Sequence, residues 1–138
     1  MNAHIQVRDY MLHEMPVIYG DTSLSKVTEI LCSNNLFGLP VVDREKKLIG
    51  FISEQDCIHE LLTSSYHCDF DLMASDVMHH EVLTVSPNDG IIELAESMQG
   101  NKPKIYPVVE EGQLLGIINR TRILKALREN LRGCHIPV

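Results

Sequence analysis

Internal duplication is the feature that most constrains how this chain folds. The 138-residue sequence aligns with itself when it is shifted by 67 positions, and a one-residue difference in a polar turn then changes the shift to 66. The aligned pairs include Asp9 with Asp76, Met11 with Met78, Pro40–Asp43 with Pro107–Glu110, and Gly50 with Gly116. Repetition over nearly the whole chain predicts two copies of one structural unit.

The two copies predict the same order of elements, β-α-β-β-α. In each copy a short apolar stretch is followed by polar residues suited to a helix N-cap, and the next apolar residues share one helical face. Two apolar runs around a polar turn then predict a β-hairpin covered on both faces, and a second helix follows. The predicted strands are 17–19, 39–42 and 48–52, then 82–85, 105–109 and 114–118, and the closing helices lie near 54–62 and 120–131.

A single copy of about 60 residues is marginal as an independent fold, so the two copies are expected to bury their sheets against each other. The sequence therefore predicts a mixed α/β (α+β) fold in which the two repeats pack about a pseudo-twofold axis and leave two related clefts. Clefts between repeats are favoured places for small ligands. The predicted boundaries are repeat 1 at 1–63, including an N-terminal helical segment, a linker at 64–74, and repeat 2 at 75–138.

Composition excludes several classes of function. The net charge is −7, which argues against charge-driven nucleic-acid binding and against a polybasic membrane anchor. No run approaches the roughly 20 apolar residues of a membrane-spanning helix, and no secretory signal is visible. The four cysteines form no C-x-x-C pair, so neither a metal site nor a redox motif is indicated. We expect a cytoplasmic protein with reduced thiols and no bound metal.

The end of the first hairpin carries the sharpest chemical pattern, Gly50-Phe51-Ile52-Ser53-Glu54-Gln55-Asp56. Ser53 and Asp56 have the spacing of a capping box, which starts a helix. A carboxylate at this place can also accept the two hydroxyl protons of a ribose diol, as an acidic residue does in dinucleotide-binding folds. Both interpretations stand, because spacing alone does not separate them.

These motifs resemble the CBS-domain family, and the doubled unit is similar to a tandem CBS-domain pair, or Bateman module. The resemblance rests on the Leu39–Asp43 run, the Gly50–Asp56 run and the segment Val7–Met11, and it covers almost the whole chain. It implies a stand-alone module that binds an adenosine-containing ligand such as AMP, ADP, ATP or S-adenosylmethionine. By the same resemblance, Ser53 and Asp56 hold the ribose. The resemblance also implies that Gly38, Leu39 and Pro40 line the adenine pocket, with Tyr106 and Pro107 as counterparts in the second copy.

The second copy departs from the family pattern. Asn119 stands in the place of Ser53, and Arg122 stands in the place of Asp56. A guanidinium cannot accept a hydroxyl proton, but its planar fork suits a phosphate. Arg120 and Lys104 add positive charge nearby, although a solvated basic surface explains the same residues. We expect one competent ribose site, in the first copy, and a degenerate second cleft.

The leading hypothesis is a regulatory module that signals ligand occupancy to an unknown effector protein. We also expect a homodimer formed through the closing helices, whose apolar residues otherwise belong to the core of the chain itself. The candidates are Ile58, Leu61, Leu62, Ile123, Leu124, Leu127 and Leu131. The alternative is a ligand-free module for protein interaction or dimerisation. A small enzyme is a weaker hypothesis, because no positioned base can be named beside Ser53 or Cys57, and we expect no catalytic residue.

Overall fold

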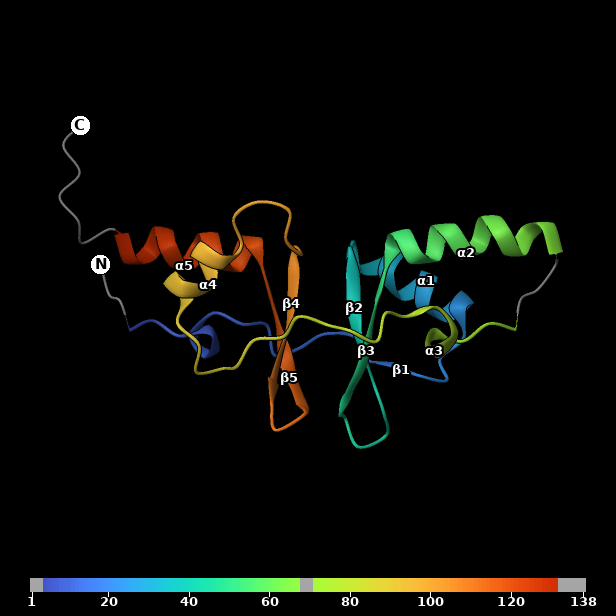
Figure 1. Cartoon of the computed structure of the whole chain (residues 1–138), viewed down its shortest axis with the longest axis horizontal. Helices are drawn as coiled ribbons and strands as arrows, with labels where there is room; N and C mark the ends of the chain where they lie inside the picture. Colours follow the sequence, from blue (N-terminus) through green and yellow to red (C-terminus); the bar gives the residue numbers. More distant parts are fainter. Residues whose placement is uncertain (1–3, 68–70, 132–138) are drawn as a thin grey trace. The chain divides into compact units, whose positions relative to one another are not determined.

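The computed structural model describes residues 4–67 and 71–131, and its mixed α/β architecture confirms the predicted fold class (Figure 1). The elements of the first copy are β1 (Ile18–Tyr19), α1 (Leu24–Asn34), β2 (Gly38–Val42), β3 (Leu48–Ser53) and α2 (Glu54–His67). Those of the second copy are α4 (Ile91–Ser97), β4 (Ile105–Glu110), β5 (Gln113–Asn119) and α5 (Arg120–Leu131). A single turn precedes each copy, η1 (Val7–Asp9) or α3 (Ala74–Val77).

The described residues divide into two compact units. The first-copy unit comprises 16–82 together with 112–114, and the second-copy unit comprises 4–15, 83–111 and 115–131. The pseudo-twofold packing of the two copies stays a prediction.

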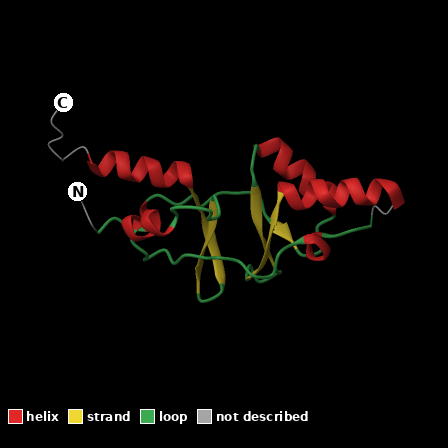
Figure 2. Ribbon diagram, turned by 45° about the horizontal axis from the view of Figure 1, so that its top comes forward, coloured by secondary structure: helices red, strands yellow, loops and turns green. Residues whose placement is uncertain are grey.

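In the first-copy unit, three strands form a sheet in the order β1-β2-β3. β1 is parallel to β2, with Ile18 opposite Val41, and β2 is antiparallel to β3, with Pro40 opposite Phe51. α2 follows β3 directly and contacts both α1 and β3 (Figure 2). Every residue of β2 is buried, as a central strand covered on both faces requires, whereas β3 is only alternately buried.

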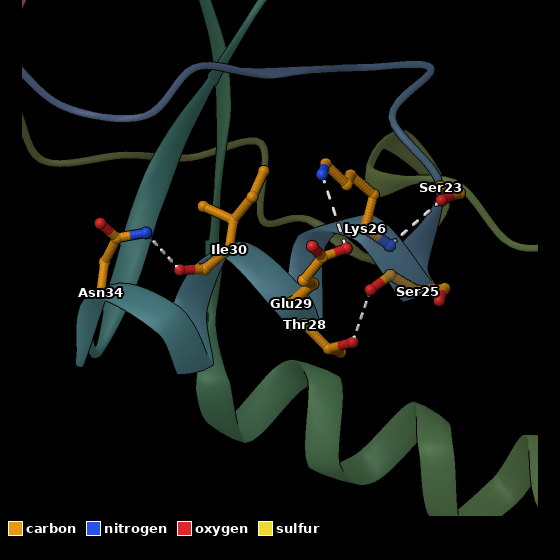
Figure 3. Close-up of polar contacts among 7 residues, drawn as sticks. All are labelled: Ser23, Ser25, Lys26, Thr28, Glu29, Ile30 and Asn34. Carbon is orange, nitrogen blue, oxygen red and sulfur yellow. Dashed lines mark hydrogen bonds and ion pairs between the residues drawn. The ribbon is translucent and has the colours of Figure 1, made fainter.

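α1 begins at the polar cluster that the sequence marks as a helix start. Ser23 is the N-cap, and its side chain accepts a hydrogen bond from the amide of Lys26 at 3.1 Å (Figure 3). The helix ends at Asn35, whose φ of 52° places it in the left-handed region. Between these caps, Leu24, Val27 and Leu31 are buried on one face, as the apolar spacing predicts.

The second-copy unit repeats this plan with a shorter sheet. β4 and β5 form a two-stranded sheet, and the predicted strand at 82–85 is reduced to one parallel bridge between Val85 and Val108. That bridge is the counterpart of Ile18 opposite Val41 in the first copy. The core of this unit is one cluster of buried side chains: Ile5, Val7, Met11, Val85, Ile91, Leu94, Tyr106, Val108, Ile118, Ile123 and Ala126.

The lead-in segments, 7–12 and 74–79, each pack against the copy that does not follow them. The amide of Leu12 donates to the carbonyl of Ile117 at 2.8 Å, and the amide of Ile117 donates back at 3.0 Å. In the same way, Phe51 and His79 exchange hydrogen bonds of 2.9 and 2.8 Å. The compact units therefore divide the chain differently from the sequence repeats, because residues 4–15 belong with the second copy.

The last turn of α2 overlaps the start of the segment 64–74 that was predicted as the linker, because the helix continues to His67. The predicted boundaries of the repeats and the linker stay a prediction. Ile123, a candidate for a dimer contact, is 4% exposed and lies in the core cluster, and Leu127 packs against that cluster. Both face inward because a helix must bury one apolar stripe against its own sheet. Leu131 lies where no side chain is described.

Candidate functional site

The capping box at the start of α2 organises Ser53 and Asp56. The amide of Ser53 donates to Oδ2 of Asp56 at 2.9 Å, and the Ser53 hydroxyl donates to the same oxygen at 2.7 Å. The amide of Asp56 in turn donates to Oγ of Ser53 at 3.2 Å. This reciprocal pattern pairs the backbone amides of Ser53 and Asp56, so the capping interpretation is confirmed.

The other oxygen of Asp56 faces a residue that the sequence analysis missed. Nε2 of His79 lies 2.8 Å from Oδ1 of Asp56, and it must carry the proton because a carboxylate only accepts. The Asp56 side chain is 17% exposed and that of His79 is 65% exposed. The carboxylate that was predicted to bind a ribose is thus already engaged through both of its oxygens.

Gly50 explains why His79 reaches this place. A Cβ built at Gly50 would lie 2.8 Å from the carbonyl oxygen of His79 and would also collide with the thioether of Met78. The missing side chain lets the lead-in segment approach the sheet closely enough to pair with Phe51. Gly116 has the same role, because a Cβ there would meet the carbonyl of Leu12. Gly50 and Gly116 therefore indicate that a lead-in segment packs closely against each hairpin, although only the structure shows which of the two segments does so.

The residues predicted to line an adenine pocket lie in the interior. Gly38, Leu39 and Pro40 form the first half of β2 and are buried, as are Tyr106 and Pro107 in β4. In the first copy, the hairpin register places Gly38 opposite Ser53 at the end of β3. A contact between these residues and an adenine ring stays a prediction.

In the second copy, Arg122 holds a lead-in segment instead of an open site. Oδ1 of Asn119 accepts from the amide of Arg122 at 2.9 Å, so Asn119 caps α5 as Ser53 caps α2. Nε of Arg122 donates to the carbonyl oxygen of Tyr10 at 2.7 Å. The last residue of the motif therefore binds a lead-in segment in both units. Asp56 contacts the side chain of His79, and Arg122 contacts the backbone carbonyl of Tyr10.

The side chain of Tyr10 is fastened to α5 as well. Its hydroxyl donates to Oε2 of Glu129 at 2.7 Å and accepts from the side-chain Nδ2 of Asn130 at 3.1 Å. The hydrogen bond to Glu129 raises the pKa of Tyr10. No signal in the sequence indicates this contact, since Tyr10 and Glu129 stand at opposite ends of the chain.

Arg120 is the predicted basic residue of the second copy that acts on Tyr106. Arg120 is exposed at the start of α5, and its amide donates to the carbonyl of Lys104 at 3.2 Å. Burial raises the pKa of Tyr106, while the positive charge of Arg120 acts in the opposite direction. The charge of Arg120 thus acts on Tyr106, and a role of Arg120 and Lys104 in holding a ligand stays a prediction.

A cavity of about 570 Å³ lies between α1 and α2 and is lined mainly by apolar side chains. Cys32 and Cys57 both line it, together with Phe37, Ile58 and Leu61. Burial raises the pKa of Cys57 to about 11, and the negative charge of Asp56 acts in the same direction. The Cys57 thiol is therefore protonated at neutral pH and is a poor nucleophile.

Within 4–67 and 71–131, no group of three or more His, Cys, Asp or Glu side chains is placed to hold a metal ion. No helix in the same ranges is long and apolar enough to cross a membrane.

The repeated architecture is matched by comparison with known proteins. The model of the CBS domain family matches residues 7–63 and, a second time, residues 74–129. The chain belongs to the CBS-domain family. The two matches in tandem make it a CBS-domain pair, which confirms the resemblance inferred from the motifs.

Curated relatives share the pair but differ in length. The CBS pair is 30% identical over 121 residues to the uncharacterized protein MJ1225 of Methanocaldococcus jannaschii, covering 88% of this chain and 42% of that protein. It is 29% identical over 127 residues to the A-adding tRNA nucleotidyltransferase of Aquifex aeolicus, covering 92% of this chain but 15% of that enzyme. This chain thus spans less than half the length of either relative.

Solved structures of similar size share the fold. CBSX2 from Arabidopsis thaliana, solved in complex with AMP, has a TM-score of 0.79 and 26% identity, covering 92% of this chain and 98% of that one. A Vibrio cholerae protein named as an acetoin utilization protein, AcuB, has a TM-score of 0.81 and 28% identity, covering 93% of this chain and 95% of that one.

Proposed function

We propose that this CBS pair is a regulatory module that binds an adenosine-containing nucleotide and signals its occupancy to a partner protein. AMP, ADP, ATP and S-adenosylmethionine are the candidate ligands. The observation that carries the proposal is the placement of Asp56, a carboxylate held at a helix start by Ser53. The AMP complex of CBSX2, which is similar over nearly its whole length, supports the same ligand class.

Ser53 and Asp56 have distinct roles in this proposal. Asp56 accepts hydrogen bonds from the 2′- and 3′-hydroxyls of the ribose, because a carboxylate is a strong acceptor and this one is partly open to solvent. Ser53 holds Oδ2 of Asp56 and so fixes the direction in which Oδ1 points. The positive end of the α2 helix dipole adds a potential that favours an anionic ligand.

We assign one competent ribose site, in the first copy. Arg122 replaces the acceptor in the second copy, and its Nε is committed to the carbonyl of Tyr10. Arg120, near Tyr106, is the remaining candidate there for contact with a phosphate. One ligand per chain is therefore expected.

Isothermal titration of the wild-type protein and Asp56→Ala with AMP, ADP, ATP and S-adenosylmethionine tests the proposal. Hydrogen bonds to a charged acceptor contribute about 1.5–3 kcal/mol, so the variant should bind roughly ten- to a hundredfold more weakly. Asp89→Ala is the matched control, since Asp89 accepts from the amide of Ser86 at 2.8 Å in the same three-residue pattern within the other unit. Equal affinity of Asp56→Ala and wild type would remove Asp56 from the site.

A ligand-free interaction module is the second candidate function. It is favoured by the engagement of both Asp56 oxygens and by the tether between Arg122 and Tyr10, which leave these motif residues with structural partners. A thermal-shift screen separates the two functions, because a ligand that binds only the native state raises Tm. No shift with any adenosine compound at millimolar concentration would favour the interaction module.

A homodimer is part of either function. Ile58, Leu61 and Leu62 on α2 are 56%, 43% and 65% exposed, which is unusual for three large apolar side chains on one helix. Leu124 on α5 is 66% exposed. A second copy of the chain would cover these side chains, and Ile58→Glu should therefore convert the dimer to a monomer in sedimentation at micromolar concentration. A wild-type protein that sediments as a monomer would refute the dimer.

A further inference from the structure

The contact between Asp56 and His79 has a direct consequence for ligand binding. A carboxylate offers about four acceptor positions. Two donors of Ser53 already use Oδ2 of Asp56, and Nε2 of His79 uses Oδ1. A ribose diol needs two acceptor positions, and only about one is left. One of the present donors must therefore leave before the diol can bind in full.

His79 is the donor that is easiest to displace. The Ser53 donors belong to the helix cap and are partly buried, so losing them would unsettle the first turn of α2. The His79 side chain is 65% exposed, and its ring can rotate into solvent with little loss of packing. Its backbone would stay in place, because the two hydrogen bonds to Phe51 do not depend on the ring.

We propose that His79 is an internal competitor for Asp56, which a ribose diol displaces on binding. This inference rests on the proposed function. It makes His79 an affinity-setting residue of the site: the Asp56–His79 contact lowers the affinity of the resting module, and the ligand releases the imidazole. The released ring lies in the lead-in segment 74–79, so occupancy of Asp56 is reported to the part of the chain that precedes the second-copy unit.

The second-copy unit has no equivalent of this release. Arg122 donates to the backbone carbonyl of Tyr10, and this contact is partly buried. Release of the guanidinium would leave the Tyr10 carbonyl without its partner and would loosen the lead-in segment 7–12 itself. Tyr10 is held a second time through its hydroxyl, which contacts Glu129 and Asn130. A displaceable contact therefore exists in the first copy alone among the described residues, which agrees with one ligand per chain.

Titration of His79→Ala with AMP tests the proposal, with His80→Ala as the control of the same type at the exposed neighbouring position. Because His79→Ala removes one hydrogen bond that competes with the ligand, it should bind AMP about two- to fivefold more tightly than wild type. The gain should vanish with 2′,3′-dideoxyadenosine monophosphate, which lacks the diol. A gain in affinity cannot arise from damage to the fold.

The outcomes separate this inference from the proposed function. If wild type binds AMP through Asp56 and His79→Ala binds no more tightly, the competition is overturned and the ribose site stands. If wild type, His79→Ala and His80→Ala all fail to bind any adenosine compound, both proposals are overturned. If His79→Ala binds AMP but the wild-type protein does not, the result would support the competition in its strongest form.

A measurement on the wild-type protein adds a readout that needs no variant at the site. The imidazole resonances of His79, assigned by their loss in His79→Ala, should move toward those of a solvent-exposed histidine when AMP is added. The resonances of His80 should not follow. An unchanged His79 signal at saturating AMP would overturn the displacement.

Discussion

Substitution of Gly50 by Ala tests whether the approach of the lead-in segment depends on a missing side chain. The new Cβ would lie 2.8 Å from the carbonyl oxygen of His79, closer than real contacts allow, and would collide with Met78. The segment 74–79 must then move away from β3 and weaken the hydrogen bonds of 2.9 and 2.8 Å between Phe51 and His79. Overpacking of this kind costs about 1–3 kcal/mol, and each weakened hydrogen bond adds about 1 kcal/mol at most.

We expect Gly50→Ala to lower the free energy of unfolding by about 2 kcal/mol, which corresponds to a fall in Tm of roughly 5–15 °C. Urea denaturation measures the first quantity and a circular-dichroism melt the second. Hydrogen exchange should also accelerate at the amides of Phe51 and His79, because these two amides form the affected pair.

Gly20→Ala is the matched control in the same unit. Its nearest neighbour would be the terminal carbon of Ile49 at 3.1 Å, the far end of a flexible side chain that can give way. Its cost should therefore be well below 1 kcal/mol. Equal stability of the two variants, with unchanged exchange at Phe51 and His79, would refute the reasoning from close approach.

Two further predictions concern the remaining contacts of the motif. Arg122→Ala should lower stability by about 1 kcal/mol and speed exchange at the amides of Leu12 and Ile117, because the tether to Tyr10 is lost; a variant with wild-type exchange there would contradict it. Cys57 should resist iodoacetamide at pH 7, while the exposed Cys32 reacts. The free energy of unfolding should also fall between about pH 9 and 11. Burial raises the pKa of Cys57 to about 11, so the native thiol stays protonated after the unfolded thiol has ionised. Mass spectrometry of the alkylated thiols and urea melts across this pH range measure both effects.

Sequence reasoning recovers the elements because their signals are local. The bounds of α5 and the start of α1 at Ser23 follow from apolar spacing and capping residues. The hairpins follow from paired apolar runs around a polar turn, and the capping box of α2 follows from two residues three apart. The strand expected at 82–85 fails in part, since only Val85 finds a partner in β4.

The pairing of the lead-in segments could not be predicted, because the duplication makes two partners equally plausible. Leu12 could pair with Phe51 in its own copy or with Ile117 in the other, and the two strands carry the same pattern. The structure selects Ile117 for Leu12 and Phe51 for His79. His79 therefore contacts Asp56 although the two residues are 23 positions apart in the sequence. The residues around His79 in the sequence indicate only a surface position.

The same motif positions serve both architecture and recognition, and this couples the two. Gly50 admits the lead-in segment, and Asp56, which binds the ribose in our proposal, also holds His79 from that segment. If a ligand and His79 compete for one carboxylate, the ligand must weaken the contact between Asp56 and His79 by the same free energy by which that contact weakens ligand binding. The second copy has no such competition, because Arg122 stands in place of the acceptor. Its guanidinium only donates hydrogen bonds and is bound to the carbonyl of Tyr10, so it cannot accept from a diol. On this argument the asymmetry between the copies is functional: one motif keeps a contact that a ligand can exchange, and the other keeps its segment fastened.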